Sequence, residues 1–146
     1  MEHLQTRIKN LLASGKTYLI NCSQEDASFK PFFKKWSKKE ILGHLIDSGI
    51  NNLQRFTEIQ YETKPYVLRQ YKQDALVIAN DYQNADLAEL LEMWFAINHR
   101  IINVIGHLDE ATLKFEVVVD NVSYDLNFIV VDYVDHMEHH LKQIMN

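Results

Sequence analysis

The sequence has little cysteine, glycine and proline, and it lacks long apolar runs. Cys22 is the only cysteine, so the chain cannot form an internal disulfide, and we expect a reducing, cytoplasmic location. Four glycines and two prolines in 146 residues leave few positions where a helix must stop, which favours long helices. No apolar stretch approaches the ~20 residues of a membrane-spanning helix, and no signal peptide precedes the first helix, so we expect no membrane partner.

The sequence also lacks an excess of positive charge. Lys and Arg total 15 against 20 Asp and Glu, which gives a formal net charge of −5. Domains that bind duplex nucleic acid are usually basic, so this balance argues against a nucleic-acid partner. Hydrophobic residues make up 47% and charged residues 24%, which is typical of a globular protein. The length suits one domain with a substantial core, so we expect residues 1–146 to form a single domain.

Apolar residues at helical spacing predict four long helices. Ser37 and Glu40 have the spacing of a capping box, and Asp86 and Asp125 are candidate caps of later helices. Gly15 weakens the C-terminal half of the first helix. The predicted fold class is all-α, a four-helix bundle with helices over residues 2–19, 37–61, 86–108 and 126–145.

The connections between these helices differ in length. Residues 64–85 are too many for a tight turn, and we expect a short helix over 73–82 within them. A crossover of this length can return along the bundle, so the second and third helices need not be antiparallel. Residues 115–124 are β-prone at their start, and a small hairpin and an irregular loop both remain open there.

Histidine is the abundant residue, with seven in the chain. His136 and His140 are four residues apart on the last helix, so both rings lie on one face and can chelate one metal ion. They flank the apolar stripe, and two core histidines satisfied by hydrogen bonds are an equally open interpretation. His44, at the edge of the buried face of the second helix, is the natural third ligand. The poorer candidates are His3, His99, His107 and His139.

Two segments resemble the DinB/YfiT-like family. Residues 35–48 (KWSKKEILGHLIDS) are similar to one family motif, and 132–144 (DYVDHMEHHLKQI) are similar to its C-terminal motif. Residues 94–100 fit the third helix of the family, and Asn51, Asn52, Arg55 and Phe56 also fit. The resemblance implies an up-down-down-up bundle, often a homodimer. It also implies one divalent metal ion held by His44, His136 and His140.

Three neutral imidazoles would leave a divalent ion its full charge and open coordination positions, as in catalytic sites. The ligand type does not distinguish Zn, Ni, Fe or Mn. Relatives in the family imply two reactions on a small-molecule substrate. One is S-transfer or isomerisation with a low-molecular-weight thiol as cofactor, which we favour, and the other is hydrolysis by activated water. A non-catalytic metal-binding stress-response or scaffold protein is a further alternative.

Four polar residues are candidates for supporting roles. Asp132, Asp47 and Gln143 each lie one turn from a histidine of the triad and could orient a ring, although each also suits a solvated or capping position. Arg55 could bind an anionic substrate group, but we favour an inter-helix ion pair. Lysines 30, 34, 35, 38 and 39 are expected on a solvated face, and Cys22, Trp36 and Trp94 in or near the core.

Overall fold

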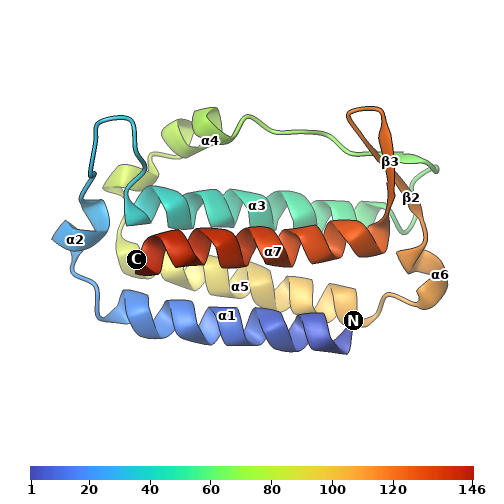
Figure 1. The fold of residues 1–146 in the computed structure, drawn as a ribbon, viewed down its shortest axis with the longest axis horizontal. Coiled ribbons are helices and arrows are strands. Elements are labelled where there is room, and N and C mark those ends of the chain that lie inside the picture. Colours follow the sequence, from blue (N-terminus) through green and yellow to red (C-terminus); the bar gives the residue numbers. More distant parts are fainter.

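The computed structural model describes all 146 residues, and four long helices form its body (Figure 1). They are α1 (Glu2–Ile20), α3 (Lys38–Glu58), α5 (Leu87–Gly106) and α7 (Leu126–Met145). In Figure 1, α1 and α7 run in one direction along the bundle, and α3 and α5 run in the other. The helices confirm the predicted four-helix bundle, and α3 ends about one turn before its predicted end near Tyr61.

Three of these helices begin at the predicted caps. The Ser37 hydroxyl accepts a hydrogen bond from the Glu40 amide, and the Glu40 carboxylate accepts one from the Ser37 amide at 2.8 Å. This capping box fixes the start of α3, and its cap residue Ser37 precedes the first candidate metal ligand, His44, by seven residues. Asp86 and Asp125 accept hydrogen bonds from amides in the first turns of α5 and α7.

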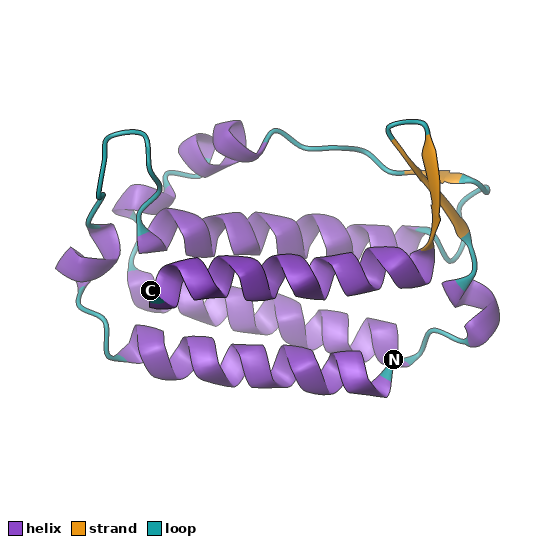
Figure 2. Cartoon of the chain, viewed as in Figure 1, coloured by secondary structure: helices purple, strands orange, loops and turns teal.

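A small sheet closes one end of the bundle. The hairpin exists, with β2 (Glu116–Val119) antiparallel to β3 (Val122–Asp125), and Asp120 and Asn121 adopt positive φ angles at its turn. The connection after α3 adds β1 (Tyr66–Val67), which pairs in parallel with β2 so that Tyr66 lies opposite Val117. Figure 2 shows the strands together at this end of the molecule.

The crossover between α3 and α5 returns along the bundle (Figure 2). It contains α4 (Gln73–Ala79), within the predicted short helix, followed by a 3-10 turn, η1 (Tyr82–Asn84). Two further short helices, α2 (Gln24–Ser28) and α6 (Glu110–Leu113), and strand β1 were not predicted. No helix of the chain combines the length and the hydropathy that crossing a bilayer would need.

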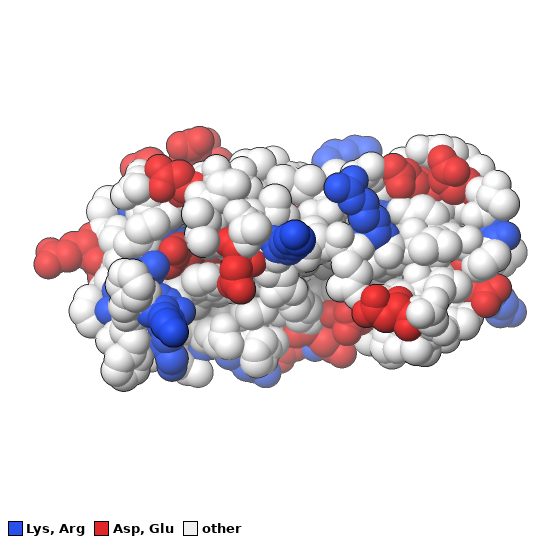
Figure 3. Space-filling view, turned by 90° about the horizontal axis from the view of Figure 1, so that it is seen from above, with Lys and Arg blue, Asp and Glu red and all other residues white.

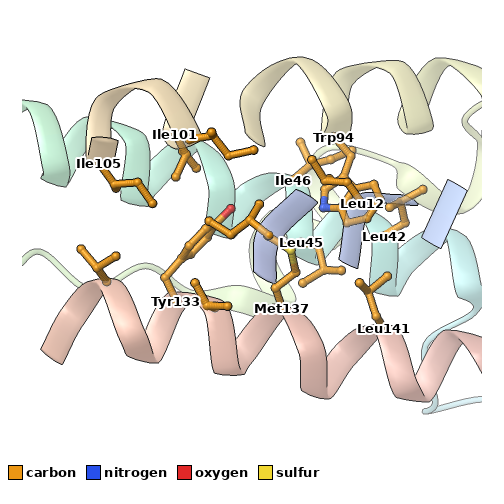
Figure 4. Close-up of a cluster of buried hydrophobic side chains, with 14 of the residues drawn as sticks. Leu12, Leu42, Leu45, Ile46, Trp94, Ile101, Ile105, Tyr133, Met137 and Leu141 are labelled. Carbon is orange, nitrogen blue, oxygen red and sulfur yellow. The ribbon is translucent and has the colours of Figure 1, made fainter. Parts of the chain in front are cut away.

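The core lies between the four long helices. Figure 4 shows side chains from all four meeting there: Leu12, Leu42, Leu45, Ile46, Trp94, Ile101, Ile105, Tyr133, Met137 and Leu141. Trp94 is fully buried, and a Cβ added at Gly15 would lie 2.9 Å from the Trp94 ring. The glycine therefore lets α1 approach α5 closely, and α1 continues through it.

Candidate metal centre

Three histidines meet where α3 packs against α7. His44 comes from α3, and His136 and His140 come from successive turns of α7. One ring nitrogen of each lies within 4.8 Å of the others, and Nε2 of His44 is 2.9 Å from Nε2 of His136. The His140 ring centroid is 4.6 Å from that of His44 and 4.5 Å from that of His136. The structure thus brings together the three histidines that the sequence nominates.

Burial keeps these imidazoles neutral. His44 has no exposed surface, and burial, together with its neighbours His136 and His140, lowers its pKa to about 3. Burial and the adjacent His140 and His139 lower the pKa of His136 to about 4. Burial also lowers the pKa of His140, against the effect of a hydrogen bond with Gln143. At neutral pH each ring therefore offers a lone pair instead of a positive charge.

The cluster fits a divalent ion. Nitrogen atoms 2.0–2.1 Å from a tetrahedral zinc ion lie roughly 3.3 Å apart. The observed separations, from 2.9 Å up to 4.8 Å, bracket that value. No carboxylate or thiolate belongs to the cluster, so the chain offers three neutral ligands and leaves further coordination positions to other molecules. This is the ligand count of catalytic sites rather than of closed structural ones.

Other side chains hold the rings in place. The Gln143 amide oxygen lies 2.8 Å from Nδ1 of His140, so a proton on Nδ1 leaves Nε2 free for a metal. The Ser48 hydroxyl lies 3.5 Å from Nδ1 of His136, and the Trp36 ring lies 5.0 Å from that of His44. Nδ1 of His44 is buried without a hydrogen-bond partner. Gln143 therefore occupies the position expected of a residue that orients a ligand.

The two candidate aspartates differ in position. Asp47 accepts hydrogen bonds from the Tyr82 hydroxyl at 2.7 Å and the Asn80 amide at 3.1 Å, so it ties α3 to the crossover and bonds no histidine. Asp132 lines the same cavity as His136. Asp132 is exposed overall, and partial desolvation at the cavity wall, followed by the charge of Asp135, raises its pKa. Of the two aspartates, only Asp132 thus lines that cavity.

The cavity has a volume of about 360 Å³ and reaches His136. It lies where α3, α7, the crossover and the hairpin meet. Sequence reasoning did not nominate several of its polar residues, among them Ser48 and Tyr71. Ser48 follows His44 by one helical turn, which could have indicated it, whereas no local pattern marks Tyr71 in the crossover. Apolar residues also line the cavity, among them Leu68, Val119, Phe128 and Ile129.

Arg55 corrects one expectation. The predicted inter-helix ion pair is wrong, because no carboxylate lies within salt-bridge distance of its guanidinium. The guanidinium donates to the Arg69 carbonyl at 2.7 Å and lies 5.5 Å from the centroid of the Tyr71 ring. Arg55 lies on the cavity wall because α3 carries it on the same side as Ser48 and Asn52.

The remaining candidates lie outside the cluster. His3, His99, His107 and His139 are exposed, and His107 caps the end of α5. The expectation that the lysines before and at the start of α3 lie on a solvated face is wrong in part. Lys39 is buried, and Lys30 and Lys38 pair with Glu40 and Asp26, because the loop before α3 folds back on the helix. On the face that carries the crossover, acidic and basic side chains are interspersed without a continuous patch of one sign (Figure 3).

Comparisons with known proteins agree with this geometry. A model of the DinB superfamily matches residues 15–144, and no curated protein sequence matches. YfiT from Bacillus subtilis, described as a probable metal-dependent hydrolase with an unusual four-helix bundle topology, superposes with a TM-score of 0.88 at 19% identity. That likeness covers 98% of this chain and 82% of YfiT.

A mycothiol-dependent maleylpyruvate isomerase has the same fold. It superposes with a TM-score of 0.74 at 12% identity, over 98% of this chain and 60% of the isomerase. The chain therefore spans less than two thirds of the isomerase. At these identities both structures establish a shared fold alone.

Proposed function

Because the chain belongs to the DinB superfamily, we propose that it is a metal-dependent enzyme whose His44, His136 and His140 hold one divalent ion beside a substrate cavity. The observation that carries the proposal is the junction of cluster and cavity at His136, which belongs to both. A metal that only clamped two helices would need no such cavity beside it. Three neutral ligands also leave coordination positions for a reacting molecule.

We propose that the reacting molecule is a low-molecular-weight thiol. A bound divalent ion lowers the pKa of a coordinated thiol or water and so supplies a nucleophile at neutral pH. The chain does not supply its own thiol to the cavity. The Cys22 Sγ lies 2.9 Å from an Asp26 carboxylate oxygen, and burial and that carboxylate raise the pKa of Cys22. The fold shared with a mycothiol-dependent enzyme supports the same assignment.

The chain's own residues then have distinct tasks. We infer that Asp132, which lines the cavity one turn from His136, accepts the proton that the nucleophile releases. Gln143 holds the His140 ring through its Nδ1 atom, and Ser48 faces Nδ1 of His136. The apolar wall of the cavity excludes water from a substrate held there.

Hydrolysis is the second candidate, with water in place of the thiol. The observation that favours it is the fold shared with YfiT, described as a probable metal-dependent hydrolase, together with a carboxylate, Asp132, beside the histidines. The same residues would serve, because a general base beside a metal-bound water needs the same placement.

One pair of assays separates the candidates. Zinc-loaded and chelator-stripped protein are given bacillithiol, mycothiol or glutathione with the electrophile monochlorobimane, and separately p-nitrophenyl acetate without thiol. We expect metal-dependent thiol conjugation, which is lost in His136→Ala and kept in His3→Ala, an exposed control. Ester hydrolysis without thiol would select the hydrolase. Metal-loaded protein that shows neither activity would contradict the proposal of an enzyme.

A further inference from the structure

Arg55 brings a positive charge into the cavity wall that no acidic side chain compensates. The residue is partly buried. Every ion pair of the chain is formed by a lysine or arginine other than Arg55. Burial lowers the pKa of Arg55, yet a guanidinium stays charged in proteins, so the cost of burying the charge persists. A partly buried arginine without a carboxylate partner is available to an anionic ligand.

The neighbours of Arg55 hold the guanidinium without using all of its donors. It donates to the Arg69 carbonyl and, at 3.4 Å, to the Asn52 side-chain oxygen. The Tyr71 ring centroid lies 5.5 Å from the guanidinium carbon, a cation–π distance. A guanidinium has five N–H donors, so donors remain for a planar, bidentate partner such as a carboxylate.

Arg55 and His136 line the same cavity. Ser48, which faces His136, precedes Arg55 by seven residues on α3, which is roughly 10 Å along the helix axis. Side chains on a helix lean toward its N-terminus, so the Arg55 side chain leans back toward the histidines. Apolar residues such as Val119 and Ile129 also line this cavity, and such a lining suits a ligand with a short carbon chain.

We propose that the cavity binds a small ligand with a carboxylate group, which Arg55 holds while the reacting end lies at His136. This inference rests on the proposed function, because it assigns the ligand class of the same site. Arg55 is a specificity residue in this account, and it takes no part in binding the metal.

The first test uses metal-free protein, so it does not depend on catalysis. Chelator-stripped protein is titrated with hexanoate and with 1-hexanol, which differ only at the polar end, and binding is followed by NMR chemical shifts. We expect hexanoate to bind about tenfold more tightly, as a charge-assisted hydrogen bond implies. Arg55→Gln should abolish the preference and Arg55→Lys should keep part of it.

Arg69→Gln is the matched control, because only the backbone carbonyl of Arg69 meets Arg55 and its side chain is exposed. It should leave the preference for hexanoate unchanged. Equal binding of hexanoate and hexanol by the native protein, or the same preference in Arg55→Gln, would overturn the proposal. Thermal melting of each variant shows whether reduced binding comes from the loss of the positive charge or from unfolding of the protein.

A second experiment identifies which of the two reactants, the thiol or the other substrate, carries the carboxylate. Cobalt-loaded protein is titrated with 6-mercaptohexanoate and 6-mercaptohexan-1-ol, and the thiolate-to-cobalt absorption reports binding. If 6-mercaptohexanoate binds more tightly than 6-mercaptohexan-1-ol, and Arg55→Gln removes this difference, the carboxylate belongs to the thiol. Equal binding of the two thiols, with the hexanoate preference intact, assigns it to the other substrate. Absence of any thiolate absorption would count against the thiol as nucleophile and leave the hexanoate result as support for Arg55.

Discussion

The surroundings of Trp94 and of His44 show how differently two fully buried rings can be used. Trp94, on α5, packs against α1 at Gly15 and against Leu141 of α7. His44 instead faces two further histidines, next to a cavity. The first region is closed and mainly apolar, although Nε1 of Trp94 is itself buried without a hydrogen-bond partner. The second region instead brings several polar rings together beside open space. Fold stability explains the first arrangement and does not explain the second.

The histidine region lowers the stability of the metal-free fold. Burial lowers the pKa values of its histidines, and Nδ1 of His44 lacks a hydrogen-bond partner. A buried polar atom without a partner costs about 1–3 kcal/mol. The comparison therefore predicts that changes near Trp94 affect unfolding and spare metal binding, and that changes near the histidines affect mainly metal binding and the response to pH.

The largest effect on stability is expected for Trp94→Ala. Removing the indole leaves a cavity between α1, α5 and α7 and should lower the free energy of unfolding by about 3–5 kcal/mol. Urea denaturation measures this. The metal bound per folded chain should stay as in the native protein. A variant that kept its stability, or that lost its metal while still folded, would break the contrast between the two regions.

Acid should destabilise the metal-free protein through the second region. The pKa of His136 is about 4 in the folded chain against 6.5 in the unfolded one, so the unfolded state binds more protons between these values. Stability is therefore lost as the pH falls below 6.5. Between pH 7 and pH 5 the loss through His136 alone should be about 2 kcal/mol.

Urea denaturation at the two pH values, with a chelator present, measures this loss. His136→Leu removes one of the titrating groups and should flatten the pH dependence, whereas the exposed control His3→Ala should not. The same pH dependence in His136→Leu as in the native chain would contradict the assignment of the acid sensitivity to this cluster.

Gly15→Ala should have a smaller effect. The added methyl group would lie 2.9 Å from the buried Trp94 ring and 3.1 Å from Leu141, which must shift to accept it. Alanine favours the helix by about 1 kcal/mol, so we expect a net loss of about 1 kcal/mol. Ser14→Ala, at the exposed position before it, serves as the control. Stabilisation by both substitutions would show that the α1–α5 contact is less tight than described.

Gln143→Ala should have the smallest effect on the free energy of unfolding and a clear effect on the affinity for the metal. Loss of the hydrogen bond to Nδ1 of His140 should weaken metal binding by about 10–100-fold, with unfolding changed by less than about 0.5 kcal/mol. Competition with a chromogenic chelator measures the affinity. Lys142→Ala, which removes only an ion pair with Glu138, is the matched control. Equal metal affinities in the two variants would show that Gln143 does not support the metal site.

Local signals predicted the helices and the histidines. The capping box at Ser37 and the Asp125 cap act within one turn, so they can be read from adjacent residues. The i, i+4 spacing placed His136 and His140 on one face. His44 could be added because its helix position puts it at the edge of an apolar stripe.

Contacts between distant segments could not be predicted in this way. Strand β1 has two residues and exists because Leu68 donates a backbone hydrogen bond to Val118, fifty residues away. The same return of the crossover brings Tyr71 to Arg55 and closes the cavity. Helix periodicity carries no information on such long-range pairing, so the environment of Arg55 was misjudged.

The central claim is that His44, His136 and His140 bind one divalent ion. Elemental analysis of untagged, dialysed protein tests it most directly, with native chain, His136→Ala and the exposed control His3→Ala compared at equal concentration. We expect about one divalent ion per chain in the native protein and in His3→Ala, and under about a tenth of that in His136→Ala. Equal metal content in His136→Ala and the native protein would contradict it.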